Sequence, residues 1–220
     1  MTTGCEQPWA DTDRAAWPDR LCLPMAFDAG RLAADVAGLA DAGTPAAWIP
    51  HFVPQHYDGD WSVLPLRAPP GDLHPILQIA PNPACRDWVD TPLLARCPYI
   101  AQVLASFACP LEAVRLMRLA PGSVIKEHRD DDLAAEDGMA RLHIPVVTNP
   151  HVDFRLNGTR VVMDAGSVWY LRLADRHSVT NAGDTARIHL VVDAIVDPWL
   201  RDRLDAAVTL SNRDDRAVMV

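Results

Sequence analysis

The sequence predicts a mainly β protein with flanking helices, built as a sandwich or barrel of short strands. The later part of the 220-residue chain is a series of β-rich runs separated by turn signals. The clearest signal is Asn157-Gly158, a pair that favours the tight turn of a β-hairpin, which lies between two such runs. Many short, evenly spaced strands are typical of sandwiches and barrels rather than of parallel α/β sheets.

Residues 1–110 predict a helical and irregular N-terminal part. Leu32, Val36 and Leu39 recur at helical spacing after Asp28, a favourable N-cap residue, and before Gly43. At two more positions a proline directly follows a capping residue, which is common at the start of a helix. The predicted helices therefore begin after Asp28, after Thr91-Pro92, near residue 99 (through 107), and at Asp197-Pro198 (through about 207).

Residues 111–195 predict the β core. The expected strands cover about 113–119, 123–128, 141–148, 152–156, 159–163, 167–171 and 186–194. Residues 196–220 predict a C-terminal helix and tail. Because no linker or repeat separates these parts, we expect a single domain over residues 1–220.

The composition argues against several function classes. A net charge of −9 without a Lys/Arg-rich run is unsuited to nucleic acid or to an anionic membrane. No apolar run approaches the ~18 residues that cross a bilayer, and the N-terminus lacks the pattern of a signal peptide. Five cysteines without a Cys-x-x-Cys spacing argue against a disulfide framework and a thiolate zinc site. We therefore expect a cytoplasmic protein.

The strongest candidate site is a metal triad. In His128-Arg129-Asp130, the first and third residues point to the same side of an extended strand, so that an imidazole and a carboxylate can hold one ion. A later histidine, His177, completes a set of two imidazoles and one carboxylate. Non-haem Fe(II) oxygenases use this set because it leaves positions open for other ligands.

Two rival pairs share the His-x-Asp spacing, His56/Asp58 and His151/Asp153. His128 is preferred because four predicted strands separate it from His177, enough for the chain to wrap a barrel and return to the same ion. His151 can share His177, but only one hairpin and one strand lie between them, and His151 follows an Asn-Pro turn. His56 has no comparable continuation.

Two strands carry a repeated basic pattern. Arg141-Leu-His143-Ile and Arg187-Ile-His189-Leu each place an arginine and a histidine on one face and apolar residues on the other. The basic faces can line a pocket, where a buried guanidinium binds a carboxylate with two hydrogen bonds. A salt-bridged strand surface is the alternative interpretation.

The motifs between about Val114 and Leu200 resemble the aspartyl/asparaginyl β-hydroxylase family of Fe(II)/2-oxoglutarate-dependent oxygenases. Their order and combination carry the resemblance: Arg-Leu-Ala-Pro-Gly-Ser-Val-Ile-Lys-Glu-His-Arg-Asp, Arg-Leu-His-Ile-Pro-Val-Val-Thr-Asn, Gly-Ser-Val-Trp-Tyr, His-Ser-Val-Thr-Asn and Arg-Ile-His-Leu-Val-Val-Asp. Before residue 110, only the segment from Gly59-Asp-Trp61 to Leu66-Arg67 is similar to the family's substrate side.

The resemblance implies a double-stranded β-helix, a cupin-like jelly roll. It also implies that Fe(II), 2-oxoglutarate and O2 are the cofactor and cosubstrates. The implied metal ligands are His128, Asp130 and His177. Arg187 would hold the distal carboxylate of 2-oxoglutarate, and Arg141 and His143 would line the cosubstrate pocket.

The substrate is less determined by the sequence. Trp61, Arg67 and Arg118 are candidates for binding it, and the acidic run 130–137 is either a lid or a solvated loop. The first hypothesis is hydroxylation of an Asp or Asn residue, in a peptide or on a carrier. The alternatives are a hydroxylase of a free amino acid such as proline, and a non-catalytic cupin that binds a metal or a small acid.

Overall fold

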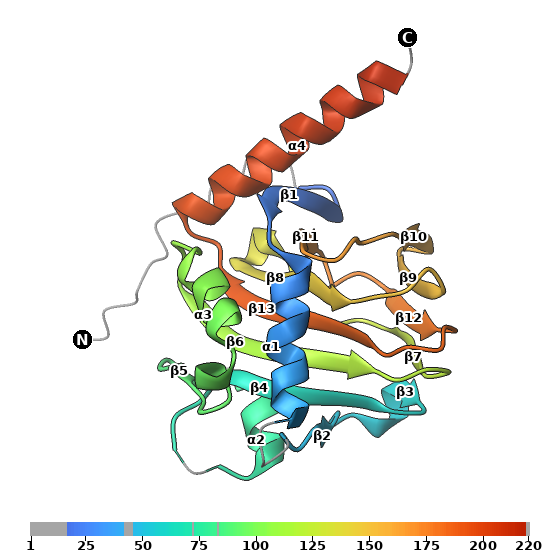
Figure 1. Ribbon diagram of the computed structural model, residues 1–220. Helices are drawn as coiled ribbons and strands as arrows, with labels where there is room; N and C mark the ends of the chain where they lie inside the picture. Colours follow the sequence, from blue (N-terminus) through green and yellow to red (C-terminus); the bar gives the residue numbers. More distant parts are fainter. Residues whose placement is uncertain (1–16, 42–45, 72, 83, 219–220) are drawn as a thin grey trace, which may run out of the picture.

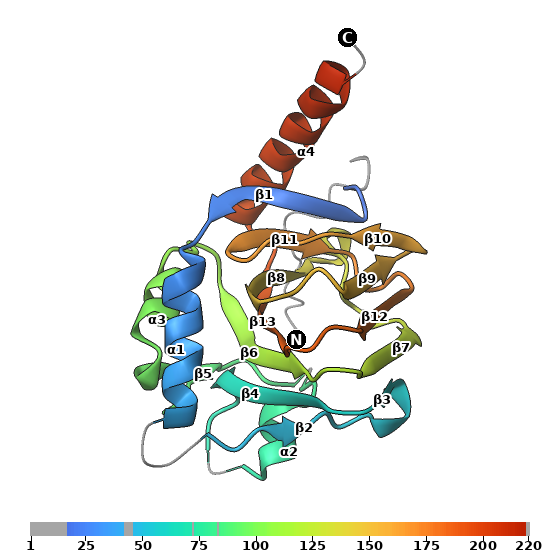
Figure 2. The ribbon, with the colours of Figure 1, turned by 45° about the vertical axis from the view of Figure 1, so that its right-hand side comes forward.

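Strand pairing organises the protein into two antiparallel sheets that pack face to face (Figures 1 and 2). The computed structural model describes residues 17–41, 46–71, 73–82 and 84–218. The larger sheet runs, in spatial order, β1 (Arg20–Ala26), β11 (Ser167–Leu171), β8 (Met139–Val147), β13 (Arg187–Ile195), β6 (Leu111–Leu119), β4 (Trp61–Ala68) and β2 (Ile49–Pro50), and β5 (Val89–Asp90) pairs with β4. The smaller sheet runs β10 (Thr159–Val161), β9 (Val152–Leu156), β12 (His177–Asn181), β7 (Val124–His128) and β3 (Tyr57–Asp58).

The winding of the chain between the sheets is that of a double-stranded β-helix. From β6 to β13 the chain crosses between the larger and the smaller sheet, with only β9 and β10 following each other in the same sheet. This order closes the strands into a cupin-like jelly roll. The fold class predicted from the sequence is confirmed.

Alternation along β8 and β13 decides what faces the interior between the sheets. Leu142 and Ile144 on β8, with Leu190 and Val192 on β13, pack into the core on the outer face of the larger sheet. The residues between them, which include the arginines and histidines of the repeated basic pattern, therefore point toward the smaller sheet. Both faces of β13 are covered, and eight of its nine residues are buried.

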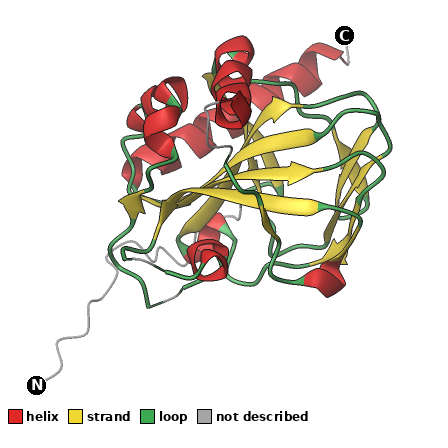
Figure 3. Cartoon of the chain, turned by 60° about the horizontal axis from the view of Figure 1, so that its bottom comes forward, coloured by secondary structure: helices red, strands yellow, loops and turns green. Residues whose placement is uncertain are grey.

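Helices cover the outer face of the larger sheet, and Figure 3 shows most of the helical segments gathered on one side of the strands. They are α1 (Ala29–Asp41), α3 (Pro98–Ala105) and the first turns of α4 (Pro198–Val218). As predicted, Asp28 caps α1, since its Oδ1 accepts a hydrogen bond from the Arg31 amide at 3.0 Å. The shorter segments are α2 (Pro75–Ile79) and the 3-10 turns η1 (Pro54–His56), η2 (Leu94–Arg96) and η3 (Ala135–Asp137).

The N-terminal part differs from its prediction as helical and irregular, because β1 to β5 contribute to both sheets. The two longest of these strands each contain a proline, and they were not predicted because proline usually argues against a strand interior. Pro24 lies in β1 and Pro65 in β4, and the pairing of both strands shifts register beside the proline. A bulge there accommodates the missing N–H group.

Three other predictions are corrected. Thr91-Pro92 precedes only the 3-10 turn η2, whereas the α-helix starts at Pro98. α4 continues past residue 207 to Val218 and extends away from the sheets (Figures 1 and 2). β12 was not predicted. The N-terminal segment 1–16 and Gly43, which the prediction placed after the first helix, lie outside the described residues. Among the residues described, no helix combines the length and the apolar character that a membrane crossing requires.

Gly166 joins the β1 edge of the larger sheet to β8, and we predict that Gly166→Ala destabilises the fold. Its amide donates to Pro145 O and its carbonyl accepts from the Phe27 amide, both at 2.8 Å. Its φ is +83°, and an added Cβ would collide with the Phe27 carbonyl. The φ strain costs about 1–2 kcal/mol and the collision about 1–3 kcal/mol more.

The matched control is Gly122→Ala, since Gly122 has a φ of +74° and open space around the added Cβ. Urea unfolding should therefore show a smaller loss for Gly122→Ala than for Gly166→Ala. Equal losses would show that the contact with Phe27 contributes nothing.

Candidate metal centre

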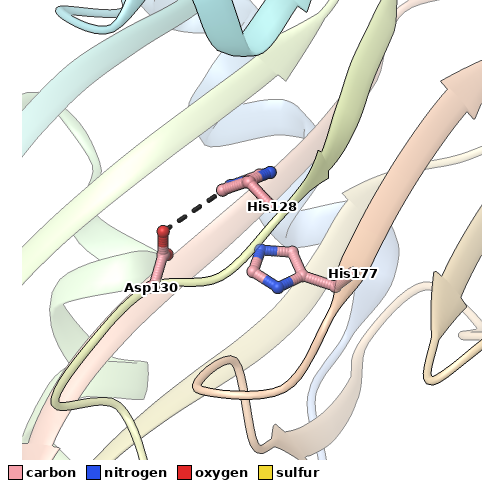
Figure 4. A group of neighbouring side chains, drawn as sticks. All are labelled: His128, Asp130 and His177. Carbon is pink, nitrogen blue, oxygen red and sulfur yellow. Dashed lines mark ion pairs between the residues drawn. The ribbon is translucent and has the colours of Figure 1, made fainter.

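His128, Asp130 and His177 meet between the two sheets (Figure 4). His128 ends β7 and His177 begins β12, and these neighbouring strands place the two residues directly opposite each other. Their ring centroids are 4.3 Å apart, and Asp130 Oδ1 lies 3.5 Å from His128 Nε2. One donor atom from each residue lies within 4.8 Å of the other two, so one ion can contact all three.

Backbone carbonyls select which nitrogen of each histidine is free. His128 Nδ1 lies 2.7 Å from Lys126 O, and His177 Nδ1 lies 3.0 Å from Asp175 O. Because a carbonyl only accepts hydrogen bonds, each Nδ1 carries the proton and each Nε2 keeps its lone pair. The Asp130 amide donates to Leu173 O at 2.9 Å, which fixes the turn that carries the carboxylate. The three groups are thus oriented in the form that binds a divalent metal.

The rival pairs are not assembled into such a cluster within the part of the chain that the structure describes. Asp58 forms an ion pair with Lys126 at 2.7 Å, and Asp153 forms one with Arg155 at 2.8 Å. His56 does approach His128, with ring centroids 4.7 Å apart, but it brings no carboxylate with it.

A cavity open to solvent surrounds the triad. Its walls come from both sheets and are largely apolar. Besides the triad, it is lined by His51, Trp61, Met117, Ile125, Arg141, His143, Phe154, Leu173, Val179 and Arg187. The structure therefore brings Arg187, Arg141, His143 and Trp61 to the cavity that holds His128, Asp130 and His177.

Arg187 is a buried cation without an acidic partner among the described residues. Its side chain comes from β13, and the residue is 2% exposed. Nη2 lies 2.8 Å from His189 Nδ1, whereas Nε has no hydrogen-bond partner. Desolvation lowers the pKa of Arg187 to about 9. Since an unpaired buried charge is costly, an anionic ligand fits this position.

Two buried histidines adjoin Arg187. His143 Nδ1 and His189 Nδ1 are 3.3 Å apart, and His143 Nε2 is buried without a partner. Burial, followed by the charge of Arg187, lowers the pKa of both residues well below 6.5. Both imidazoles are therefore neutral at pH 7, and they line or support the floor of the cavity without adding charge.

Arg141 is fully engaged by carboxylates. Its Nε and Nη2 donate to Asp193 at 2.6 and 2.9 Å, and its Nη1 donates to Asp130 Oδ2 at 2.9 Å. Asp193 also accepts from Arg115 at 2.9 Å. Of the two arginines that line the cavity, only Arg187 lacks an acidic partner.

An aromatic pair also lines the cavity. Trp61, at the start of β4, stacks on His51 with ring centroids 3.5 Å apart. Burial lowers the pKa of His51 to about 3, so this ring is neutral. Sequence reasoning missed His51, since the pairing of β2 with β4 that brings it to Trp61 has no periodic signal in a segment of two residues.

Arg67 and Arg118, proposed from the sequence as substrate residues, do not line the cavity. Arg67 lies at the far end of β4 and binds Asp90 and the Trp88 carbonyl. Arg118 binds Asp60 at 3.0 Å and Ser62 at 3.1 Å. Both guanidinium groups are used in local pairs, so we leave them out of the site.

The acidic run 130–137 is anchored rather than free. Leu133, Ala134 and Ala135 are buried. The Ala135 amide donates to the Tyr170 hydroxyl at 3.0 Å, and Glu136 pairs with Arg172 at 3.0 Å. These contacts describe a fixed loop beside the metal centre.

The sequence matches known proteins over most of its length. Residues 47–196 match the family model described as aspartyl/asparaginyl beta-hydroxylase. The chain is also 26% identical, over 196 residues, to an L-proline cis-4-hydroxylase of Rhizobium meliloti (strain 1021). That alignment covers 86% of this chain and 67% of the relative.

Two solved structures are remotely similar. A 2OG-Fe(II) oxygenase family oxidoreductase from Burkholderia pseudomallei is 18% identical, with 82% of this chain and 87% of that chain covered and a TM-score of 0.49. A Pseudomonas putida prolyl-4-hydroxylase is 17% identical, with 81% and 93% covered and a TM-score of 0.45.

The neutral state of His143 and His189 predicts acid sensitivity. Their pKa values are depressed in the folded chain, so below about pH 6.5 the unfolded chain binds more protons than the folded one. The stabilising contribution is complete above about pH 6.5 and is lost as the pH falls below it. Urea unfolding of the metal-free protein at about pH 7.5 and about pH 5.5 measures this loss.

His143→Asn should reduce the difference in unfolding free energy between the two pH values, because asparagine binds no proton. His151→Asn, at an exposed position, should leave the difference unchanged. A difference that is the same in the wild-type chain and in His143→Asn would contradict the assignment of a neutral, buried His143.

Proposed function

The chain belongs to the aspartyl/asparaginyl β-hydroxylase family, and on this premise we propose that it uses Fe(II), 2-oxoglutarate and O2 to hydroxylate an unactivated C–H bond of a small amino acid. One observation carries the proposal. A triad of two imidazoles and one carboxylate shares a cavity with Arg187, a buried guanidinium that has no acidic partner among the described residues.

The donor set fits Fe(II). Imidazole and carboxylate are ligands of intermediate and hard character, and two of the first with one of the second is the set found in non-haem iron oxygenases. The free Nε2 atoms of His128 and His177 and Asp130 Oδ1 are the atoms that would hold the metal. Three protein ligands leave open positions on the metal for exogenous ligands.

The charges of the cavity fit a dicarboxylate cosubstrate. Arg187 would bind its distal carboxylate, which supplies the missing partner of the guanidinium. Arg141 is held by Asp193 and Asp130, so its place in the site is at the edge of the metal ligands. When Fe(II) and 2-oxoglutarate are bound, oxidative decarboxylation by O2 to succinate and CO2 supplies the oxygen atom that turns a substrate C–H into C–OH.

The remaining walls favour a substrate whose reacting part is uncharged. The lining also includes Trp61, Met117, Ile125 and Leu173, with the neutral ring of His51. Once Arg187 is paired with the cosubstrate, no arginine of the lining remains to balance an aspartate side chain. A proline-like ring can pack against the stacked His51–Trp61 pair, and the similarity to a proline hydroxylase supports the same substrate class.

This preferred substrate differs from the first hypothesis from the sequence, which is an Asp or Asn residue in a peptide or on a carrier. A free amino acid with an uncharged side chain is now the first candidate. The intact triad and Arg187 share one cavity, which argues against a non-catalytic cupin that binds a metal alone or a small acid alone.

Arg187→Ala should weaken the use of 2-oxoglutarate. Removing the guanidinium leaves the distal carboxylate of the cosubstrate buried and unpaired, at a cost of roughly 3–5 kcal/mol. This corresponds to a KM for 2-oxoglutarate about 150- to 4000-fold higher. Succinate release at varied 2-oxoglutarate concentrations measures this effect.

The matched control is Arg176→Ala, an exposed arginine that adjoins His177 in sequence but does not line the cavity. Its KM for 2-oxoglutarate should equal that of the wild-type enzyme. An unchanged KM in Arg187→Ala would remove Arg187 from the cosubstrate site.

A substrate panel tests the reaction and its specificity together. The Fe(II)-loaded protein is given 2-oxoglutarate with free proline, free aspartate, free asparagine, or a peptide that contains Asp and Asn. We expect succinate release coupled to the mass gain of one oxygen atom with proline, and little or no product with aspartate. Product from the peptide alone would restore the first hypothesis, whereas Asp130→Ala should give neither succinate nor product.

A further inference from the structure

We propose that Asp193 is a positioning residue for the metal centre. It fixes the guanidinium of Arg141, which holds one oxygen of Asp130 and leaves the other oxygen for the metal. This inference rests on the proposed metal site and adds a residue that touches neither the metal nor the substrate.

The contacts between Arg141 and Asp193 are those of a rigid clamp. The two residues are directly opposite each other on β8 and β13. Asp193 Oδ1 accepts from Arg141 Nε at 2.6 Å, and Oδ2 accepts from Nη2 at 2.9 Å. Two parallel hydrogen bonds fix the plane of the guanidinium as well as its position. They leave Nη1 as the arm that points toward Asp130.

The two oxygens of Asp130 are thereby divided. Oδ2 accepts from Arg141 Nη1 at 2.9 Å, whereas Oδ1 lies 3.5 Å from His128 Nε2, the nitrogen that keeps its lone pair (Figure 4). Asp130 can bind a metal through Oδ1 without giving up Arg141. Binding through both oxygens would require Oδ2 to be shared between the metal and Arg141. One-oxygen binding keeps a further position on the metal free for small ligands.

Asp193 also limits how strongly Arg141 pulls on Asp130. A guanidinium that is free to turn would offer two N–H donors to Asp130 and compete with the metal for both oxygens. Asp193 occupies the edge formed by Nε and Nη2, so that Nη1 is the nitrogen that donates to Asp130. It also separates Arg141 from Arg115, which binds Asp193 Oδ2 at 2.9 Å, so that the carboxylate lies between two cations.

The environment keeps Asp193 charged and in place. The side chains of Arg115 and Asp193 are 4% and 9% exposed, which protects their hydrogen bonds from water. Burial opposes ionisation of Asp193, but Arg141 and Arg115 outweigh it and lower its pKa to about 2. The carboxylate is thus ionised at every pH at which the protein would work.

Metal binding by the metal-free protein tests the inference. Co²⁺ is titrated into wild type and Asp193→Asn and followed by visible absorption, with the melting temperature measured in parallel. Asparagine can accept only one of the two Arg141 hydrogen bonds, so we expect about 10- to 100-fold weaker Co²⁺ binding. The control is Asp90→Asn, which breaks another cross-strand Arg–Asp pair of the same sheet, outside the cavity, and should bind Co²⁺ like wild type.

A double variant separates positioning from general stability. If Asp193 acts through Arg141, adding Asp193→Asn to Arg141→Met should weaken Co²⁺ binding no further. Additive losses would overturn the inference, as would equal affinities of wild type and Asp193→Asn. If Asp193→Asn does not fold, Asp193→Glu keeps the charge while moving the carboxylate, and should weaken binding in a folded chain; unchanged binding there would also overturn it. A wild-type chain that binds no Co²⁺ would instead refute the metal site of the proposed function.

Discussion

The cross-strand pairing of His128 with His177 is the constraint on which the site depends. These residues are far apart in sequence, yet the pairing of β7 with β12 makes them direct neighbours across the smaller sheet. A shift of one residue would turn one of the two side chains to the opposite face. The carbonyls that fix the free nitrogen of each ring belong to residues two positions earlier on the same chain segments. Strand register therefore determines both the position and the chemical form of the ligands.

A second set of polar groups lies on the facing sheet. Arg115, Arg141 and Asp193 come from three adjacent strands, and Arg187 lies on the same central strand as Asp193. Burying so many charges is costly unless they are paired. Three of these groups pair with one another or with Asp130, whereas Arg187 does not. The contrast distinguishes the cations that build the site from the one that is available to a ligand.

The sequence predicted the jelly-roll core well because its strands carry period-2 alternation and are bounded by turn signals. It also placed Arg141, His143 and Arg187 on inward faces, since alternation alone decides this once one face is apolar. It did not reveal β1 and β4, where a proline sits at a bulge, or β12, whose five residues have little apolar content. Arg67 and Arg118 were misplaced because their orientation depends on partners such as Asp90 and Asp60, which only tertiary pairing brings near. His51 and Asp193 were missed as members of the site for the same reason.

The distribution of the site over the two sheets links its parts to the rigidity of the sandwich. The candidate metal ligands belong to the smaller sheet and the turn that follows β7, whereas Arg187 belongs to the larger sheet. A partial separation of the sheets would leave the three candidate ligands together but remove the guanidinium groups of Arg187 and Arg141 from their reach. Such a loosened state would lose a dicarboxylate, and it would bind a metal ion more weakly because Arg141 would no longer hold Asp130. A metal ion and a dicarboxylate bound together would therefore link the two sheets. The difference in denaturant concentration between release of the dicarboxylate and cooperative unfolding would report how firmly the two sheets are held together.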